Sequence, residues 1–203
     1  MSVVAVIPIK PFAEGKSRLA SVLTNDQRRT LNRNMFCHVL KTAFATQEID
    51  EILVISSDEE ALTLAEQAGA HAILEAENSN LNAALDIGRK ASLALGAASL
   101  LVIPADLAQL APSDLSALLT ASDQSPSAAI FVASDQSQKG TNALYMRPID
   151  AIPFSFGPDS FEKHQGAAKD AGCNVSVIVR PNLAFDIDEP EDLRGLDENY
   201  WRA

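Results

Sequence analysis

Short apolar runs and amphipathic stretches alternate along the chain up to about residue 133. The short runs are typical of strands buried on both faces. Between them, apolar residues recur at helical spacing, as Leu31, Met35 and Val39 do. Thr24 with Gln27 forms a capping box at the start of that stretch. The pattern predicts strands at 3–7, 51–56, 72–74, 100–103 and 128–133, and helices at 24–46, 59–68, 82–95 and 113–121.

After residue 133 the order of the predicted elements becomes irregular. We expect strands at 143–146 and 175–179, a helix at 159–171, an extended segment at 184–186 and a final helix at 190–196, which Pro190 would open. The earlier β-α repetition predicts a mostly parallel, doubly wound central sheet, so the fold class is α/β and Rossmann-like. No repeat, low-complexity segment or linker interrupts residues 1–203, which predicts a single domain.

The composition is that of an ordinary globular protein with an aliphatic core: 203 residues, 47% hydrophobic and 5% aromatic. No apolar run approaches the ~20 residues that span a bilayer. The apolar start of the chain lacks the basic residues of a signal peptide. Cys37 and Cys173 lie far apart without a CxxC motif, so neither a disulfide framework nor a zinc site is expected. We therefore expect a cytoplasmic protein with no membrane partner.

The net charge of −11 restricts the kind of partner. A broad nucleic-acid surface needs clustered cations that displace counterions, so a nucleic-acid partner is not expected. A single nucleotide remains compatible with this charge, because it needs only a few local cations, a helix N-terminus and a metal.

Asp106 follows the buried strand 100–103 after a proline. In an open α/β sheet, ligands gather in the crevice beyond the carboxyl ends of the strands, and Asp106 is expected at that crevice. An aspartate at this position either caps a turn or helix, or serves as a metal ligand presented by a rigid strand. The other polar motifs of the chain favour the metal ligand.

The loop after the first strand contains Lys10, Lys16 and Arg18 beside Gly15. Three cations near the carboxyl end of a strand could hold the phosphates of a nucleotide, with Arg18 as a planar fork and the lysines as point charges. The loop lacks the GxxxxGK[ST] pattern of a Walker P-loop. The alternative is a solvated basic loop without a ligand.

A second group of acids lies near the C-terminus, in the stretch 186–192. Alternation along an extended segment points Asp186 and Asp188 to the same side. Together with Asp106 they could bind Mg²⁺, which prefers oxygen ligands. The remaining acids of this stretch are more simply explained as first-turn residues that complement a helix dipole. These are Glu189, Glu191 and Asp192.

Two turns rich in small polar residues, 140–143 and 156–161, offer an anion site. Gly157 permits close backbone approach. Ser160 stands at the expected start of a helix, whose N–H groups and dipole favour an anion. The alternative is that Ser160 or Asp159 only caps this helix. His164, one turn further on, could help to bind an anion or could be structural.

The ordered set of motifs resembles the phospholactate guanylyltransferase family of coenzyme F420 biosynthesis, over residues 3 to about 196. Each motif by itself is weak, and the six in this order are specific. They are Ile7-Pro8-Ile9-Lys10-Pro11 with Lys16-Ser17-Arg18-Leu19, Leu81-Asn82-Ala83-Ala84-Leu85, Pro104-Ala105-Asp106-Leu107, Gly140-Thr141-Asn142-Ala143-Leu144, Phe156-Gly157 with Ser160-Phe161 and His164, and Asp186-Ile187-Asp188 with Pro190-Glu191-Asp192-Leu193.

The resemblance implies a GT-A-like nucleotidyltransferase that transfers GMP from GTP to a three-carbon phosphate acid and releases pyrophosphate. The acceptor in different members is phosphoenolpyruvate, 2-phospho-L-lactate or 3-phospho-D-glycerate. The expected partners are GTP and this acid, with a homodimer and a hand-off of product to the next transferase of the pathway left open. Other readings are a different nucleotidyltransferase of the same fold, or a catalytically silent nucleotide-binding protein.

The resemblance also implies roles for individual residues. Asp106, Asp186 and Asp188 would bind Mg²⁺, and Lys16, Arg18 and Asp106 would act in catalysis. Asn82, at a helix start, would contact guanine through its amide or the adjacent backbone. The full expected sets are Lys10, Lys16, Arg18 and Asn82 for the nucleotide, and Thr141, Gly157 and Ser160 for the acceptor.

Overall fold

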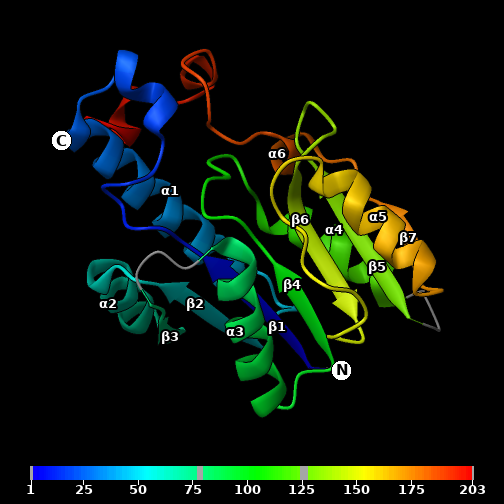
Figure 1. The fold of residues 1–203 in the computed structure, drawn as a ribbon. Helices are drawn as coiled ribbons and strands as arrows, with labels where there is room; N and C mark the ends of the chain where they lie inside the picture. Colours follow the sequence, from blue (N-terminus) through cyan, green and yellow to red (C-terminus); the bar gives the residue numbers. More distant parts are fainter. Residues whose placement is uncertain (1, 77–79, 124–127, 203) are drawn as a thin grey trace.

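One seven-stranded sheet forms the centre of the computed structural model, which describes residues 2–76, 80–123 and 128–202 (Figure 1). The strand order is β3-β2-β1-β4-β6-β5-β7. All neighbouring pairs are parallel except those of β6, which runs antiparallel to β4 and β5. The strands are β1 (Val3–Pro8), β2 (Glu51–Ser56), β3 (His71–Leu74), β4 (Ser99–Val102), β5 (Ala129–Ser134), β6 (Thr141–Arg147) and β7 (Asn174–Val177).

Helices cover both faces of the sheet. Apolar side chains of α1, α2, α4 and α6 pack on one face, and those of α3 and α5 pack on the other, the near face in Figure 1. Within the described residues, no helix has both the length and the apolar character needed to cross a membrane. The helices are α1 (Asn25–Phe44), α2 (Glu59–Ala68), α3 (Leu81–Ala94), α4 (Pro112–Asp123), α5 (Ser160–Asp170) and α6 (Pro181–Ala184), with short 3₁₀ helices η1 (Ser17–Ser21), η2 (Asp192–Gly195) and η3 (Glu198–Tyr200).

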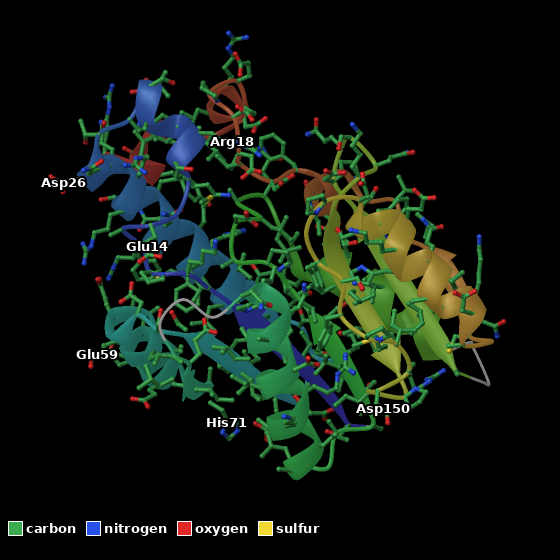
Figure 2. The ribbon with its side chains drawn as sticks, in the orientation of Figure 1. Glu14, Arg18, Asp26, Glu59, His71 and Asp150 are labelled. Carbon is green, nitrogen blue, oxygen red and sulfur yellow. The ribbon has the colours of Figure 1, made fainter. Side chains whose placement is uncertain are left out.

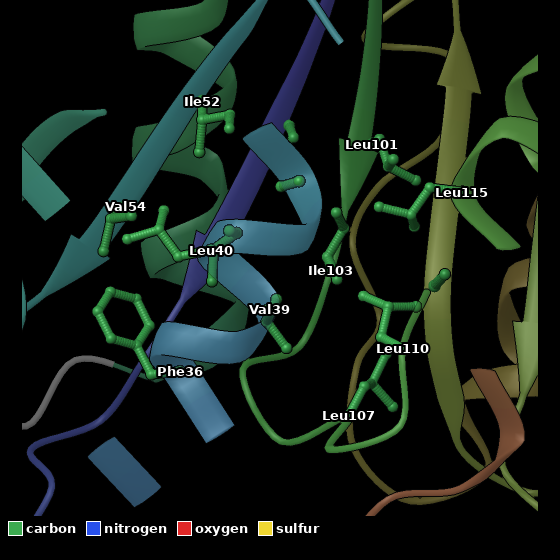
Figure 3. Packing of buried hydrophobic residues seen from close by; sticks show 14 of the residues in the cluster. Phe36, Val39, Leu40, Ile52, Val54, Leu101, Ile103, Leu107, Leu110 and Leu115 are labelled. Atoms are coloured by element: carbon green, nitrogen blue, oxygen red, sulfur yellow. The ribbon is translucent and has the colours of Figure 1, made fainter. Parts of the chain in front are cut away.

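Helix α1 shows how the sequence pattern becomes packing. The capping box between Thr24 and Gln27 is present in the structure and satisfies backbone donors at the helix start. Phe36 and Leu40 of the apolar stripe are buried beside Val54 of β2, and Val39 of the same helix lies toward Ile103, which follows β4 (Figure 3). Burial of such a side chain contributes about 1.5–3 kcal/mol, so this stripe holds α1 against the face of the sheet.

The α/β class and the mostly parallel sheet are confirmed. The predicted strands and helices up to residue 133 agree with the structure to within a few residues at each end. The irregular order after residue 133 arises because β6 is inserted between β4 and β5 in the reverse direction. Its first residues therefore lie at the same sheet edge as the carboxyl ends of the parallel strands.

Two predictions near the C-terminus were wrong. The segment 184–186 is not wholly extended, since Ala184 is the last residue of α6. The expected helix at 190–196 is only the 3₁₀ helix η2. The side chain of Asp192 accepts hydrogen bonds from the backbone N–H groups of Asp188 and Glu189, at 2.9 and 2.7 Å. This tight turn satisfies the donors locally and favours i→i+3 bonds over a longer α-helix.

Candidate active site

A pocket of about 350 Å³ lies at the carboxyl edge of the sheet, beyond β1 and β4. Its walls include Lys10 and Lys16 from the loop after β1, Asp106 from the segment after β4, and Asp188. Figure 2 labels Glu14 and Arg18 on the N-terminal segment that passes over this edge. The structure thus brings residues from both ends of the chain to one place, as parallel strands of an open sheet allow.

Three carboxylates form a compact cluster at this edge. One oxygen of each of Asp106, Asp186 and Asp188 lies within 4.8 Å of the others. Oxygen atoms at such spacing suit a hard divalent cation. The predicted cluster is therefore assembled by the fold, and its donor set fits the metal expected there.

The pKa of Asp186 reflects its burial and the repulsion between the three carboxylates. Burial raises the pKa of the Asp186 carboxyl to about 6, and the negative charges of Asp106 and Asp188 add to the effect. A hydrogen bond donated by the Asn142 side chain, at 3.2 Å, opposes the rise. Three carboxylates this close repel one another unless a cation lies among them.

Lys16 supplies one such cation from the protein itself. Its Nζ lies 2.6 Å from Asp106 Oδ2 and 3.0 Å from Asp188 Oδ1, and its side chain is 8% exposed. Burial lowers the pKa of this ammonium, but its charge attraction and hydrogen bonds to the two aspartates outweigh burial and hold the pKa above its usual value. The backbone of Lys16 is in the left-handed region with φ 58°, a conformation that a non-glycine residue adopts only under constraint.

The other two predicted cations have different surroundings. Arg18, on η1, is 65% exposed and reaches Asp188 at 3.4 Å and Glu189 at 3.2 Å. Lys10 is exposed and contributes to the pocket wall. Of the three, Lys16 is therefore the one fixed at the acidic cluster, and Arg18 lies at the rim.

Two residues that the sequence analysis missed shape the loop after β1. Asp58 Oδ2 accepts a hydrogen bond from the Phe12 backbone N–H at 2.8 Å, and Asn32 Nδ2 donates to the Phe12 carbonyl at 2.7 Å. Asn32 is 7% exposed and adjoins the apolar stripe of α1. A buried asparagine beside such a stripe is a signal that could have been read from the sequence, because it requires partners.

Gly15 allows the loop to approach Asn32, and Gly15→Ala should disturb the pocket. An added Cβ would lie 2.5 Å from Asn32 Nδ2, which cannot yield without breaking its bond to Phe12. We expect a loss of about 1–3 kcal/mol in the free energy of unfolding and a raised KM for the nucleotide. Urea denaturation and steady-state kinetics would measure both.

Gly166→Ala is the matched control for this variant. Gly166 lies inside α5, and an added Cβ there meets nothing within 4 Å. This change should stabilise the helix by about 0.5–1 kcal/mol and leave the KM for the nucleotide unchanged. Equal stability effects of the two substitutions would contradict the assigned role of Gly15.

Asn82 lies at the start of α3, and both polar atoms of its side chain contact one residue. Its Nδ2 donates to the carbonyl of Phe156 at 3.0 Å, and its Oδ1 accepts from the Phe156 N–H at 2.8 Å. Phe156 lines the pocket. Asn82 therefore anchors the turn that precedes Gly157 to α3, and its amide is not turned freely toward a base.

The two turns expected to bind an acceptor meet at His164. Its Nδ1 lies 3.0 Å from Thr141 Oγ1, and its Nε2 accepts from the backbone N–H of Ser155 at 3.0 Å. The ring is fully buried, and burial lowers its pKa to about 4. A neutral ring that accepts at Nε2 carries its proton on Nδ1, so Thr141 accepts from it and keeps its own hydroxyl proton to donate elsewhere.

A register shift in the pairing of β5 with β6 lies between the surroundings of His164 and the acidic cluster. The pairing of β5 with β6 shifts at Ser134 and leaves Asn142 without an opposite residue. Such a bulge re-aims neighbouring side chains. Next to this irregularity, Thr141 contacts His164 of α5, whereas Asn142 reaches Asp186, which follows α6.

The remaining acceptor residues lie close by, beside the pocket rather than in its wall. Gly157 has φ 125° and an added Cβ would meet nothing within 4 Å. Ser160 is 2% exposed and is the first residue of α5, while Asp159 occupies the N-cap position without a side-chain capping bond. Thr141, Gly157 and Ser160 are not among the described residues that line the pocket.

The sheet order and the acidic cluster at its carboxyl edge can be compared with those of known proteins. The structure superposes on a nucleotidyl transferase from Methanothermobacter with a TM-score of 0.69 and 12% identity, covering 98% of this chain and 97% of that one. At this identity the likeness shows the fold. The family model described as "Guanylyl transferase CofC like" matches residues 3–197. The chain belongs to this family, and it is an enzyme of the nucleotidyltransferase class.

Two relatives extend the comparison over nearly the whole chain. A protein of Rubrobacter xylanophilus is 45% identical over 197 residues, which cover 97% of this chain and 94% of the relative. A protein of Sphaerobacter thermophilus is 39% identical, with coverage of 97% and 93%. Both relatives carry the name phosphoenolpyruvate guanylyltransferase.

Proposed function

We propose that the protein transfers GMP from GTP to a three-carbon phosphate acid and releases pyrophosphate, in the biosynthesis of coenzyme F420. The observation that carries the proposal is Lys16 between Asp106 and Asp188 in the pocket wall. The two relatives' name makes phosphoenolpyruvate the first acceptor to test, with 2-phospho-L-lactate and 3-phospho-D-glycerate as the others.

The proposed reaction needs no general base. A phosphate oxygen of the acceptor forms a bond to the α-phosphorus of GTP, and the bond between that phosphorus and the bridging oxygen of the β-phosphate breaks. Since the second pKa of a phosphate monoester is about 6, the attacking group is already largely ionised at neutral pH. The difficulty is charge, because two unit charges about 4 Å apart repel by about 4 kcal/mol at an effective dielectric constant of about 20.

Residues of the pocket would offset this repulsion. Lys16 is charged and held beside the acidic cluster, so it can add positive charge where the phosphates would lie. Lys10 and Arg18 add positive charge at the wall and the rim. Asp106, Asp186 and Asp188 would hold Mg²⁺, which supplies charge neutralisation at phosphate oxygens when bound. Positioning and electrostatics then account for catalysis.

Thr141, Gly157 and Ser160 are the residues proposed to bind the acceptor's phosphate and carboxylate. Three features support this assignment. The Thr141 hydroxyl keeps a proton to donate, because His164 occupies it as an acceptor. The hydroxyl of Ser160 stands at the start of α5 and would be the donor there, because the backbone N–H groups of Ser160 and Phe161 already donate to the carbonyls of Gly157 and Lys139. Gly157 leaves open space where a side chain would project.

Ser160→Ala should raise the KM of the acceptor about tenfold and leave the KM of GTP almost unchanged, since one hydrogen bond to a charged group contributes about 1.5–3 kcal/mol. Steady-state kinetics with each substrate varied in turn would measure the split. The alternative is a purely structural role for this buried hydroxyl, for which the melting temperature would fall while both KM values stay the same. That pattern would remove Ser160 from the acceptor site.

The activity itself is tested by mixing the protein with GTP, Mg²⁺ and each acceptor separately and measuring pyrophosphate release. The next enzyme of the pathway is added so that a labile product does not escape detection. Release that requires GTP and one of the three acids supports the proposal. Release from another nucleoside triphosphate alone would indicate a different nucleotidyltransferase, and nucleotide binding without release would indicate a silent binding protein.

A further inference from the structure

Glu75 follows β3 directly and belongs to the wall of the same pocket. Its backbone N–H donates to the carbonyl of Ser56 at 3.0 Å, which continues the pairing of β3 with β2. The segment that carries Glu75 is thus held by the sheet. Its Oε2 is buried and, among the described residues, has no hydrogen-bond partner.

A buried acceptor without a donor is costly, because it has lost water and gained nothing in return. Such a group is found where a ligand supplies the missing donor or where function requires the strain. Because Glu75 lines a cavity, a ligand bound there would lie beside its side chain and could contact Oε2 once the carboxylate turns toward it. Such a ligand must offer hydrogen-bond donors to the Glu75 carboxylate.

The position of Glu75 in the sheet indicates which part of a bound nucleotide it would contact. β3 is three strands away from β4, after which Asp106 follows. At about 4.8 Å per strand, the two carboxylates stand roughly 14 Å apart across the sheet edge. That separation leaves room for a ribose and a base when the phosphates lie beside Lys16. The wall of the pocket also includes the apolar residues Leu81 and Ala84 of α3.

We propose that Glu75 recognises the guanine base of the nucleotide. The Watson–Crick edge of guanine presents two neighbouring donors, N1–H and the 2-amino group, and a carboxylate is an acceptor only. Adenine presents an acceptor at N1 and so opposes Glu75. The inference deepens the proposed function and rests on GTP being the donor substrate. It assigns recognition of the base to Glu75, after β3, and not to the Asn82 amide, which is hydrogen-bonded to Phe156.

The test compares GTP, ITP and ATP with the wild-type protein and Glu75→Gln. ITP differs from GTP only in lacking the 2-amino group. Dissociation constants from calorimetry and kcat/KM from pyrophosphate release are measured for each nucleotide. Wild type should prefer GTP to ITP about tenfold or more, as expected when one charged hydrogen bond is lost. In Glu75→Gln, GTP should weaken at least tenfold and the ratio of GTP to ITP should fall toward one.

Glu66→Gln is the matched control, since it removes one negative charge from the exposed surface of α2. It should keep the wild-type ratio of GTP to ITP. The melting temperature of ligand-free Glu75→Gln should not fall, because Oε2 has no hydrogen-bond partner among the residues that the structure describes. An unchanged ratio of GTP to ITP in Glu75→Gln would overturn the inference.

The outcomes separate this inference from the proposed function. If the wild-type protein shows no preference for GTP over ATP in binding or turnover, guanylyl transfer itself fails. If wild type prefers GTP and turns it over, but Glu75→Gln keeps the preference of GTP over ITP, only the assignment of Glu75 fails. Glu75→Asp provides a second variant, in which a shortened carboxylate should weaken GTP less than Glu75→Gln does.

Discussion

Asp106→Asn should lower kcat for guanylyl transfer about a thousandfold and leave the fold intact. The change removes one negative charge from the cluster of three carboxylates and keeps the volume of the side chain. If the cluster holds a divalent metal that contributes several kcal/mol to the transition state, loss of one charged ligand removes about 4 kcal/mol, which corresponds to about three powers of ten. Steady-state kinetics over a range of Mg²⁺ concentrations would measure the loss.

Two further variants complete this test. Asp188→Asn should behave in the same way and require more Mg²⁺ for half-maximal activity. Asp170→Asn, at the exposed end of α5, removes the same charge away from the cluster and should have wild-type kinetics. Near-normal turnover of Asp106→Asn at saturating Mg²⁺ would falsify the assignment of Asp106 as a metal ligand.

Lys16→Ala should lower kcat about a hundredfold or more and also raise the KM of GTP. Lys16 is 8% exposed and fixed between two carboxylates, so its charge acts in a site that excludes most water. Removal of one preorganised donor from such a site costs about 10²–10³ in rate. Arg18→Ala should cost only a few-fold, because Arg18 is 65% exposed and exposed charges are screened. Kinetics of the two variants measure the ranking.

The melting temperature in the presence of Mg²⁺ tests the role of Lys16 without relying on turnover. Without Lys16 the cluster lacks its internal cation, so added Mg²⁺ should raise the melting temperature of Lys16→Ala more than that of wild type. Lys41→Ala, an exposed cation of α1, is the control and should match wild type. If Arg18→Ala lost as much activity as Lys16→Ala, burial would not be what distinguishes the two cations.

The order of strands and helices up to residue 133 was readable from the sequence because those signals are local. The capping box at Thr24 and the left-handed Gly69 at the end of α2 mark helix ends within a few residues of chain. The C-terminal region was not readable in this way. There, Asp192 competes with a longer helix through bonds to the backbone N–H groups of Asp188 and Glu189, which helix propensity does not describe.

The acidic cluster was also predictable in part. Asp106 follows a buried strand, and alternation places Asp186 and Asp188 on one side, so the three candidates could be named before their distances were known. The partners that hold them could not. Asn142 reaches Asp186, and Lys16 reaches Asp106 across 90 residues of chain. No local pattern reports contacts of such sequence separation.

The sequence by itself therefore determined the α/β class, the order of the elements up to residue 133 and the identity of the charged residues at the sheet edge, because hydrophobic periodicity and strand ends are local properties. Only the tertiary structure decided which charges are buried and which groups are left without partners. Lys16 and Arg18 look equivalent in the sequence, yet one is enclosed by carboxylates and the other lies at the rim. Glu75 became a candidate only because the fold places it in the pocket wall and buries its Oε2 without a donor among the described residues, since burial and pairing depend on neighbours distant along the chain.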